Sequence, residues 1–249
     1  MDWSDRGIVL SARKHGESSL IVQLLTEAHG RHAGLVRGGA SSRSRGLYQP
    51  GNLLAAHWRA RLSEHLGNYA CELVTSTAAK LLDNGGKLAA LSSAAALAEA
   101  ALPEREPHAD VFESFAALIE VLSQGTSARS SAKAGAAWAA DYVRFELRLL
   151  ASLGFGLDLG SCAATGVNDN LAFVSPKTGR AVSLSAGEAW RDKLLALPPF
   201  LLADTPPAPG EIAKGLALTG FFLARHVFAP HNKGLPAARV RLAERLVKS

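Results

Sequence analysis

The sequence of 249 residues is poor in cysteine and in aromatic residues, with two cysteines and 6% aromatics. Cys71 and Cys162 are too few for the disulfide framework of a small secreted domain. The opening residues MDWSDRGIVL lack the basic segment and apolar run of a signal peptide. No run approaches the roughly 18 apolar residues of a membrane span. We therefore expect a soluble, cytoplasmic protein without a membrane partner.

Sequence patterns of catalysis and cofactor binding are also missing. There is no GxxxxGK[ST], no GxSxG and no HExxH. In GFGLDLG (154–160) the third glycine comes one place late for a dinucleotide loop, and the segment follows a predicted helix, so we predict a helix end and a turn. CAAT (162–165) offers one cysteine where a structural zinc site needs paired ligands. The sequence predicts no catalytic residue, no cofactor and no metal.

Acidic residues are unevenly distributed. Residues 1–69 contain nine Lys and Arg against five acids, and residues 225–249 contain six against one. The middle of the chain is slightly acidic, although the whole carries a net charge of +5. Segregated charge of this kind indicates a charged partner more clearly than the total does.

Short strand-like runs fill the first part of the chain: 7–13, 19–27, 31–38 and 52–61, with 66–75 as an uncertain fifth. Five short strands in this length suit a small closed barrel such as the OB-fold. From about residue 73 the pattern becomes helical. Helices are expected over 77–102, with a break at Gly85–Gly86, and over 111–122, 132–153, 210–228 and 236–248. LAFVSPKTGRAVSL predicts a hairpin. The fold class is therefore multidomain α+β: an OB-fold barrel over 1–76, then an all-α helical bundle over 77–249 with a small β-hairpin insert at about 155–185.

Arginine dominates the predicted barrel, because residues 28–63 hold six arginines and no acid. Arginine matches phosphate oxygens, and nearby aromatic rings could stack on bases. We expect Tyr48, Trp58 and Tyr69 to be such rings, with core packing as the alternative. The predicted DNA-binding residues are Arg13, Lys14, Arg31, Arg37, Arg43, Arg45, Arg59 and Arg61.

The basic C-terminal part supports the same nucleic-acid partner. Six cations there are opposed by one acid, Glu244: Arg225, Lys233, Arg239, Arg241, Arg245 and Lys248. The alternative is an ordinary amphipathic C-terminal helix with Leu242 and Leu246 packed inward.

The chain resembles the RecO family of bacterial recombination mediators. The resemblance is dense over residues 6–61, returns in FELRLLASLGFGLDLGSCAATG (145–166) and FVSPKTGRAV (173–182), and is weak in APHNKGLPAARVRL. It implies an OB-fold followed by a helical bundle with an insert. Some family members carry a four-cysteine zinc site in this insert, of which the sequence retains Cys162 alone.

The resemblance also implies function: non-enzymatic DNA repair and recombination work in the bacterial nucleoid. Such a protein binds single- and double-stranded DNA without strong sequence preference and anneals strands. It contacts RecR and the tail of single-strand-binding protein, and helps to load RecA. The tail is acidic and ends in an apolar residue, so it needs an apolar slot surrounded by cations. The partner-binding residues expected for it are Phe221, Phe222, Arg225, Phe228, Lys233 and Arg239, with the alternative that these phenylalanines are core residues. The alternatives are a helical adaptor whose barrel docks proteins instead of DNA and, less favoured, a small-molecule enzyme.

Overall fold

The computed structural model describes residues 1–41, 44, 46–124 and 137–248. The chain forms two compact units, residues 1–124 and 125–249. The first unit contains the strands together with the two helices that follow them. It therefore extends beyond residue 76, and the domain boundary predicted there stays a prediction.

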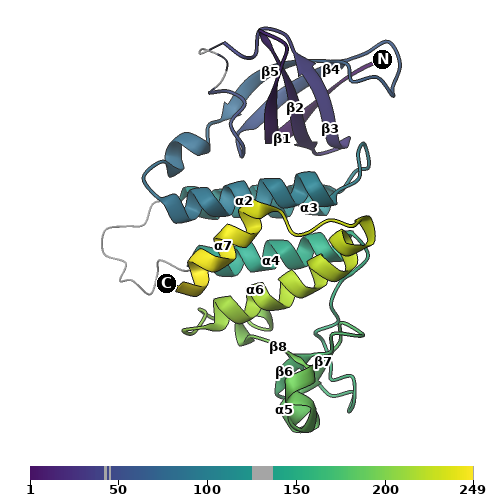
Figure 1. Cartoon of the computed structure of the whole chain (residues 1–249), viewed down its shortest axis with the longest axis vertical. Helices are drawn as coiled ribbons and strands as arrows, with labels where there is room; N and C mark the ends of the chain where they lie inside the picture. The colour runs from purple at the N-terminus through teal and green to yellow at the C-terminus, as the bar shows by residue number, and fades with distance from the viewer. Residues whose placement is uncertain (42–43, 45, 125–136, 249) are drawn as a thin grey trace. The chain divides into compact units, whose positions relative to one another are not determined.

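Five strands of the first unit form a closed barrel in the order β1-β2-β3-β5-β4 (Figure 1). The strands are β1 (Asp2–His15), β2 (Ser19–Thr26), β3 (Gly30–Val36), β4 (Leu53–Arg59) and β5 (Asn68–Thr75). All neighbouring pairs are antiparallel except β3 and β5. The uncertain fifth strand is therefore formed, and the α+β class is confirmed.

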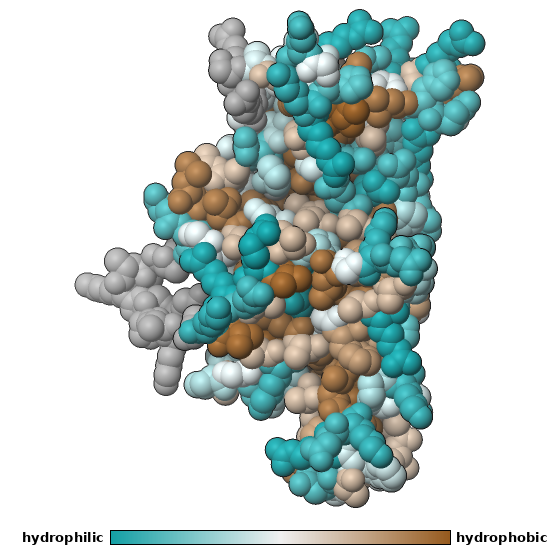
Figure 2. Space-filling model, in the orientation of Figure 1, coloured by the Kyte–Doolittle hydropathy of each residue, from teal (hydrophilic) through white to brown (hydrophobic). Residues whose placement is uncertain are grey.

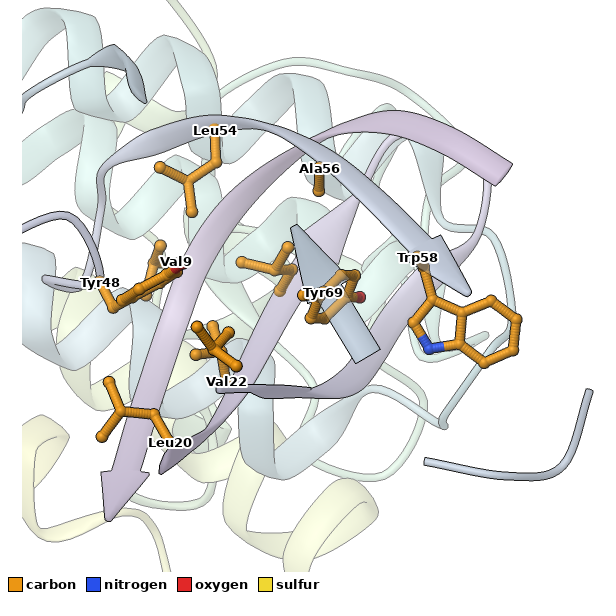
Figure 3. Close-up of a cluster of buried hydrophobic side chains, with 10 residues drawn as sticks. Val9, Leu20, Val22, Tyr48, Leu54, Ala56, Trp58 and Tyr69 are labelled. Atoms are coloured by element: carbon orange, nitrogen blue, oxygen red, sulfur yellow. The ribbon is translucent and has the colours of Figure 1, made fainter. Parts of the chain in front are cut away.

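Alternation of side chains explains the barrel core. Successive residues of a strand point to opposite faces, so Leu54, Ala56 and Trp58 of β4 are buried while the residues between them are exposed. The core cluster brings together residues from all five strands and the β3–β4 connection. Its members are Val9, Leu20, Val22, Leu24, Val36, Tyr48, Leu54, Ala56, Trp58 and Tyr69 (Figure 3).

The expected stacking role of three aromatic residues is wrong for this conformation. Trp58 is only 2% exposed, and Tyr48 and Tyr69 are also buried. Figure 3 shows the two tyrosine rings among the aliphatic core side chains. The Trp58 indole N–H donates to the Leu66 carbonyl at 3.0 Å, which satisfies its polar atom in the interior. These rings stabilise the barrel and present no open face to a base.

Two helices complete the first unit, after the short 3-10 turn η1 (Ala78–Leu81): α2 (Gly85–Ala101) and α3 (Ala109–Ser123). The Asn84 side chain accepts hydrogen bonds from the Gly86 and Lys87 amides, so the two glycines begin α2 instead of interrupting a longer helix. The Lys87 ammonium donates to the carbonyls of Leu122 and Gln124 at the end of α3. This contact ties the start of α2 to the end of α3.

The second unit is helical with a small sheet. Its main helices are α4 (Ala137–Ser152), α6 (Glu211–Phe222), which continues as the π-helix η5 (Leu223–Phe228) and the 3-10 turn η6 (Ala229–His231), and α7 (Ala237–Lys248). Helix α6 packs against α4 and α7. The insert contains β6 (Leu171–Val174), β7 (Ala181–Ser183), α5 (Leu184–Gly187), η3 (Glu188–Lys193), β8 (Leu195–Ala196) and η4 (Pro199–Leu201). The predicted hairpin is thus present, and β8 adds a third strand beside β6.

One helical stretch, Glu211–His231, is long and apolar enough to cross a membrane by length and composition alone, with a mean hydropathy of 1.3. Within the second unit, 56% of that window is buried. This is the pattern of a core helix, in which apolar residues pack against neighbouring helices. Hydrophilic residues cover much of the barrel exterior and of the insert on the face shown in Figure 2.

Candidate nucleic-acid interface

Strand register shows which predicted DNA-binding residues of the barrel lie near one another and which do not. Lys14 of β1 lies opposite Leu20 of β2, which lies opposite Val36 at the end of β3. Arg37 is the next residue after Val36. At the start of β5, Asn68 is paired with Leu35 on one side and with Arg59 on the other. Arg37 and Arg59 therefore lie on either side of the start of β5. Arg59 also pairs with Asp2, at the other end of β1 from Lys14, so Lys14 lies elsewhere on the barrel.

At the start of β5 is a shallow hollow of about 340 Å³ lined by Arg37, Asn68 and Tyr69. Arg59 is the cross-strand neighbour of Asn68 and, by alternation with buried Trp58, points to the outside. Arg61 follows β4 by two residues and is exposed. We use the name "barrel rim" for Arg37, Arg59 and Arg61.

Carboxylates do little to neutralise the positive charge of the barrel rim. Asp2 is the cross-strand neighbour of Arg59, but their charged groups form no ion pair within the described residues. Two other barrel acids are engaged elsewhere: Asp5 is 2.9 Å from the His29 ring, and Glu27 is 2.7 Å from Arg6. The rim cations consequently face solvent without ion-pair partners in the described part of the chain.

Arg13 is a different case. Its guanidinium lies 2.7 Å from the Glu99 carboxylate of α2, although the side chain is 76% exposed. Lys14, by contrast, lines a groove of about 440 Å³ together with Gln49 and Pro50. Arg13 is partly neutralised, whereas Lys14 adds positive charge to this groove, which is separate from the barrel rim.

Arg31 lies at the opposite end of β3 and is occupied. Its side chain is mostly buried, donates to the Leu102 carbonyl at 2.8 Å, and lies 3.2 Å from the Glu104 carboxylate. It fastens the start of β3 to the segment between α2 and α3. We therefore leave Arg31 out of the barrel rim. Arg43 and Arg45 lie outside the described residues.

The predicted partner site in the second unit needs correction. Arg239 is 3% exposed and forms a buried ion pair with Glu146, with Nε 2.5 Å from Oε1. It also donates to the Leu216 carbonyl at 2.7 Å, so it joins α7 to α4 and α6. Burial alone would lower the pKa of Arg239, but the Glu146 carboxylate outweighs it and the pKa is raised. Arg239 is a core residue, and in this conformation it cannot bind the carboxylates of a peptide at the surface.

Two of the predicted phenylalanines are also core, because Phe222 and Phe228 are buried. Phe221 is half-buried, and the Arg225 guanidinium lies 5.8 Å above its ring centre. Lys233 is exposed. What remains of that site at the surface is the Phe221–Arg225 pair with Lys233.

The segment that resembles a dinucleotide loop in sequence is a helix end. Gly154 has φ of +85°, and the Gly154 and Phe155 amides donate back to the Ala151 and Leu150 carbonyls. This is the Schellman arrangement, and it agrees with the predicted helix end.

Among the described residues, no three His, Cys, Asp or Glu side chains gather to hold a metal ion. Cys162 is buried, and its Sγ accepts a hydrogen bond from the Ser183 backbone amide at 3.3 Å.

The fold defines a class of protein in which a small closed barrel precedes helices that carry an inserted sheet. The comparisons narrow this class to one family. Residues 1–77 match the family described as Recombination protein O N terminal, and residues 82–235 match Recombination protein O C terminal. The chain belongs to the RecO family, as its sequence predicts.

Full-length relatives agree with this assignment. The chain is 55% identical over 251 residues to the DNA repair protein RecO of Rhodospirillum centenum, covering 100% of this chain and 96% of that protein. It is 51% identical to the DNA repair protein RecO of Rhodospirillum rubrum over 99% of this chain and 96% of the relative. It is 51% identical to the DNA repair protein RecO of Phenylobacterium zucineum, over 99% of this chain and 98% of the relative.

Proposed function

We propose that this protein acts in DNA repair and recombination as a non-enzymatic mediator. It binds single- and double-stranded DNA without strong sequence preference, promotes annealing, and helps to load RecA on DNA coated by single-strand-binding protein. The single observation that carries the DNA-binding part is the barrel rim, where Arg37, Arg59 and Arg61 face solvent around the start of β5. Guanidinium groups in such an array neutralise phosphates, which supplies affinity independent of sequence.

The strand order supports assignment of the barrel to the OB-fold class, which we include in the proposal. In that class, one face of the barrel and the loops beside it bind oligonucleotides. Here the rim includes the end of β3 and the beginning of β5. The segment between β3 and β4, which holds Arg43 and Arg45, starts at the same rim, and both arginines stay in the proposal.

The test is the salt dependence of DNA binding by the full chain. Arg37, Arg59 and Arg61 are each replaced by glutamine, singly and together, and binding of a labelled oligothymidine is titrated at several salt concentrations. Each phosphate interaction that a substitution removes should reduce the slope of log K against log salt by about 0.7 for a single strand. The triple variant should therefore bind more weakly, with a slope flatter by about two.

Arg6→Gln is the matched control. Arg6 is an exposed barrel arginine, but Glu27 already pairs with it at 2.7 Å. Its removal changes the net charge by the same step as each rim variant. An equal effect of Arg6→Gln and Arg37→Gln would show that net charge matters and the rim does not. Unchanged binding by a folded triple variant would favour the adaptor alternative, in which the barrel docks proteins.

The proposal includes the partners implied by the family: RecR, the acidic tail of single-strand-binding protein and, indirectly, RecA. For the tail we retain the Phe221–Arg225 pair with Lys233, and drop Arg239, Phe222 and Phe228 because they are buried. Arg225→Glu should then weaken binding of the tail peptide. A cytoplasmic location and the absence of a membrane partner, a cofactor and a metal belong to the same proposal.

A further inference from the structure

A row of stacked rings reaches the surface of the second unit at the end of α4. Phe155 stacks on His226 with ring centres 5.3 Å apart, and His226 stacks on Phe222 with centres 5.9 Å apart. The inner member, Phe222, is buried, whereas Phe155 is 39% exposed. We propose that Phe155, backed by His226, forms a stacking platform for one base of single-stranded DNA. This proposal rests on the DNA-binding function above and adds a second contact in the other unit.

Local backbone structure fixes the exposed ring. The Schellman arrangement at Gly154 ends α4 and places Phe155 directly after the left-handed residue, with its amide bonded to the Leu150 carbonyl at 2.8 Å. A ring held in this way loses little conformational entropy when a base stacks on it. Phe155 is therefore preorganised for stacking.

The second ring lies in an irregular helix. His226 and Arg225 belong to η5, the π-helical segment Leu223–Phe228 that follows α6. Single π-helical turns inside α-helices are rare and frequently occur at functional sites. The extra residue of the wider turn changes which side chains face outward, and here His226 meets Phe155.

Beside the rings is a pocket of about 180 Å³, lined among others by Phe155, His226, Lys177 and Gly179. A cavity of about 150 Å³ accommodates one benzene ring, whereas pockets for larger ligands exceed about 300 Å³. The volume therefore suits one flat ring better than several residues of a peptide. Gly179 has φ of +68°, and a Cβ there would lie 3.2 Å from Leu157, so the wall is kept close and free of side chains.

The charge around the pocket favours an anionic ligand. Lys177 on the β6–β7 turn lines the pocket and is exposed, and no described carboxylate forms an ion pair with it. The nearby acid Asp158 is paired with Arg180 at 3.2 Å. Lys177 is thus available for the phosphate next to a stacked base.

The experiment separates stacking from phosphate binding with the full chain and two probes of equal charge. One is an oligothymidine and the other is an abasic strand of the same length, each labelled for fluorescence anisotropy. Phe155→Ala should weaken binding of the oligothymidine about tenfold. Its effect on the abasic strand should be small, and Phe155→Trp should restore binding because it keeps a stacking face.

Trp190→Ala is the matched control. Trp190 is a 57% exposed aromatic in the same unit with Lys193 5.1 Å from its ring centre, but it lies outside the pocket. This variant should leave binding of both strands unchanged. Photocrosslinking of a strand that carries 5-iodouracil gives an independent measurement, and should label peptides that contain Phe155 or His226.

Several results would overturn the platform. They are unchanged oligothymidine binding by folded Phe155→Ala, equal losses on both strands, or an equal loss in Trp190→Ala. A loss confined to an acidic peptide ending in phenylalanine would assign the pocket to a protein tail. If the wild type binds neither strand, the DNA-binding function itself fails. If the wild type binds and only the rim variants weaken it, that function stands and the platform does not.

Discussion

His32 is a buried titratable residue of the barrel. Its ring lies 4.9 Å from the Trp58 ring and 5.0 Å from that of Trp3, and its Nδ1 is 2.9 Å from the Ala33 carbonyl oxygen. Burial lowers the pKa of His32 to about 4, since the charged form loses its hydration. The folded state therefore favours neutral His32, while the unfolded chain protonates it near its usual pKa of about 6.5.

We predict that the barrel loses stability as the pH falls below about 6.5, until the pH reaches about 4 where the folded form also binds the proton. The full effect is at most about 3 kcal/mol, from 1.36 kcal/mol per pKa unit. Urea midpoints at pH 7 and pH 5 measure the part of this loss that falls above pH 5. His32→Leu should flatten the dependence, whereas exposed His15→Leu should retain it. Parallel losses in all three proteins would assign the dependence to other groups.

The buried pair of Arg239 and Glu146 gives a second prediction. Arg239→Met leaves the Glu146 carboxylate buried without its cation, so the free energy of unfolding should fall by about 3–5 kcal/mol. Adding Glu146→Leu should recover much of that loss, because two apolar residues need no partner. Urea unfolding of both single variants and the double variant forms the cycle. Losses that simply add would show that the two side chains do not interact.

These residues also show what sequence could and could not predict. The alternation along β4 places Trp58 with Leu54 and Ala56, so its burial was accessible from the pattern. The role of Arg239 could not be predicted from the sequence, because its partner Glu146 lies 93 residues earlier on another helix. Nor could composition reveal that Arg31 bonds the Leu102 carbonyl while Arg37 remains open. Basic residues are visible in a sequence, but the acids that neutralise them are brought near only by the fold.

At the level of elements, the β2–β3 turn depends on one glycine. Gly30 has φ of +65°, and a Cβ there would lie 1.9 Å from the Glu106 backbone oxygen. The turn therefore contacts the segment between α2 and α3 at a distance that only glycine permits. The neighbouring Arg31 bonds the same segment, so the two residues together join the barrel to its helices within the first unit.

We predict that Gly30→Ala destabilises the first unit much more than Gly38→Ala. Gly38 has a nearly identical φ of +68° but nothing within 4 Å of the added carbon. Backbone strain of about 1–3 kcal/mol is common to both variants, so the difference between their urea midpoints isolates the clash. Equal midpoints would mean that the helical segment moves away from the barrel at little cost.

Elements with a long, regular pattern were predictable, and short or context-dependent ones were not. The apolar stripe over 111–122 predicts α3, and the alternating runs predict the first four strands. The strand β8 has two residues, too few to show a period, and forms because it pairs with β6. The glycines at 85 and 86 suggest a break, yet the Asn84 side chain makes them a helix start. The π-helical turn η5 has no recognised sequence signature, since it arises within an ordinary helical pattern.

On the scale of the whole chain, the family models divide the sequence near residue 80, whereas the compact units divide near residue 125. The difference is α2 and α3, which the C-terminal family model includes but which pack with the barrel as one unit. Sequence pattern changes where strands give way to helices. The boundary between the compact units lies where side chains no longer pack into a common core. Hydrophobic periodicity along the sequence does not show this boundary.

The two compact units should therefore unfold in separate steps, because each has its own core. The four tryptophans are divided evenly, with Trp3 and Trp58 in the first unit and Trp138 and Trp190 in the second. Urea unfolding followed by fluorescence, in variants that keep only one pair, should give two different midpoints. Gly30→Ala should shift the midpoint reported by Trp3 and Trp58, and Arg239→Met the midpoint reported by the other pair. A single midpoint that both variants shift equally would mean that the units stabilise one another and unfold as one.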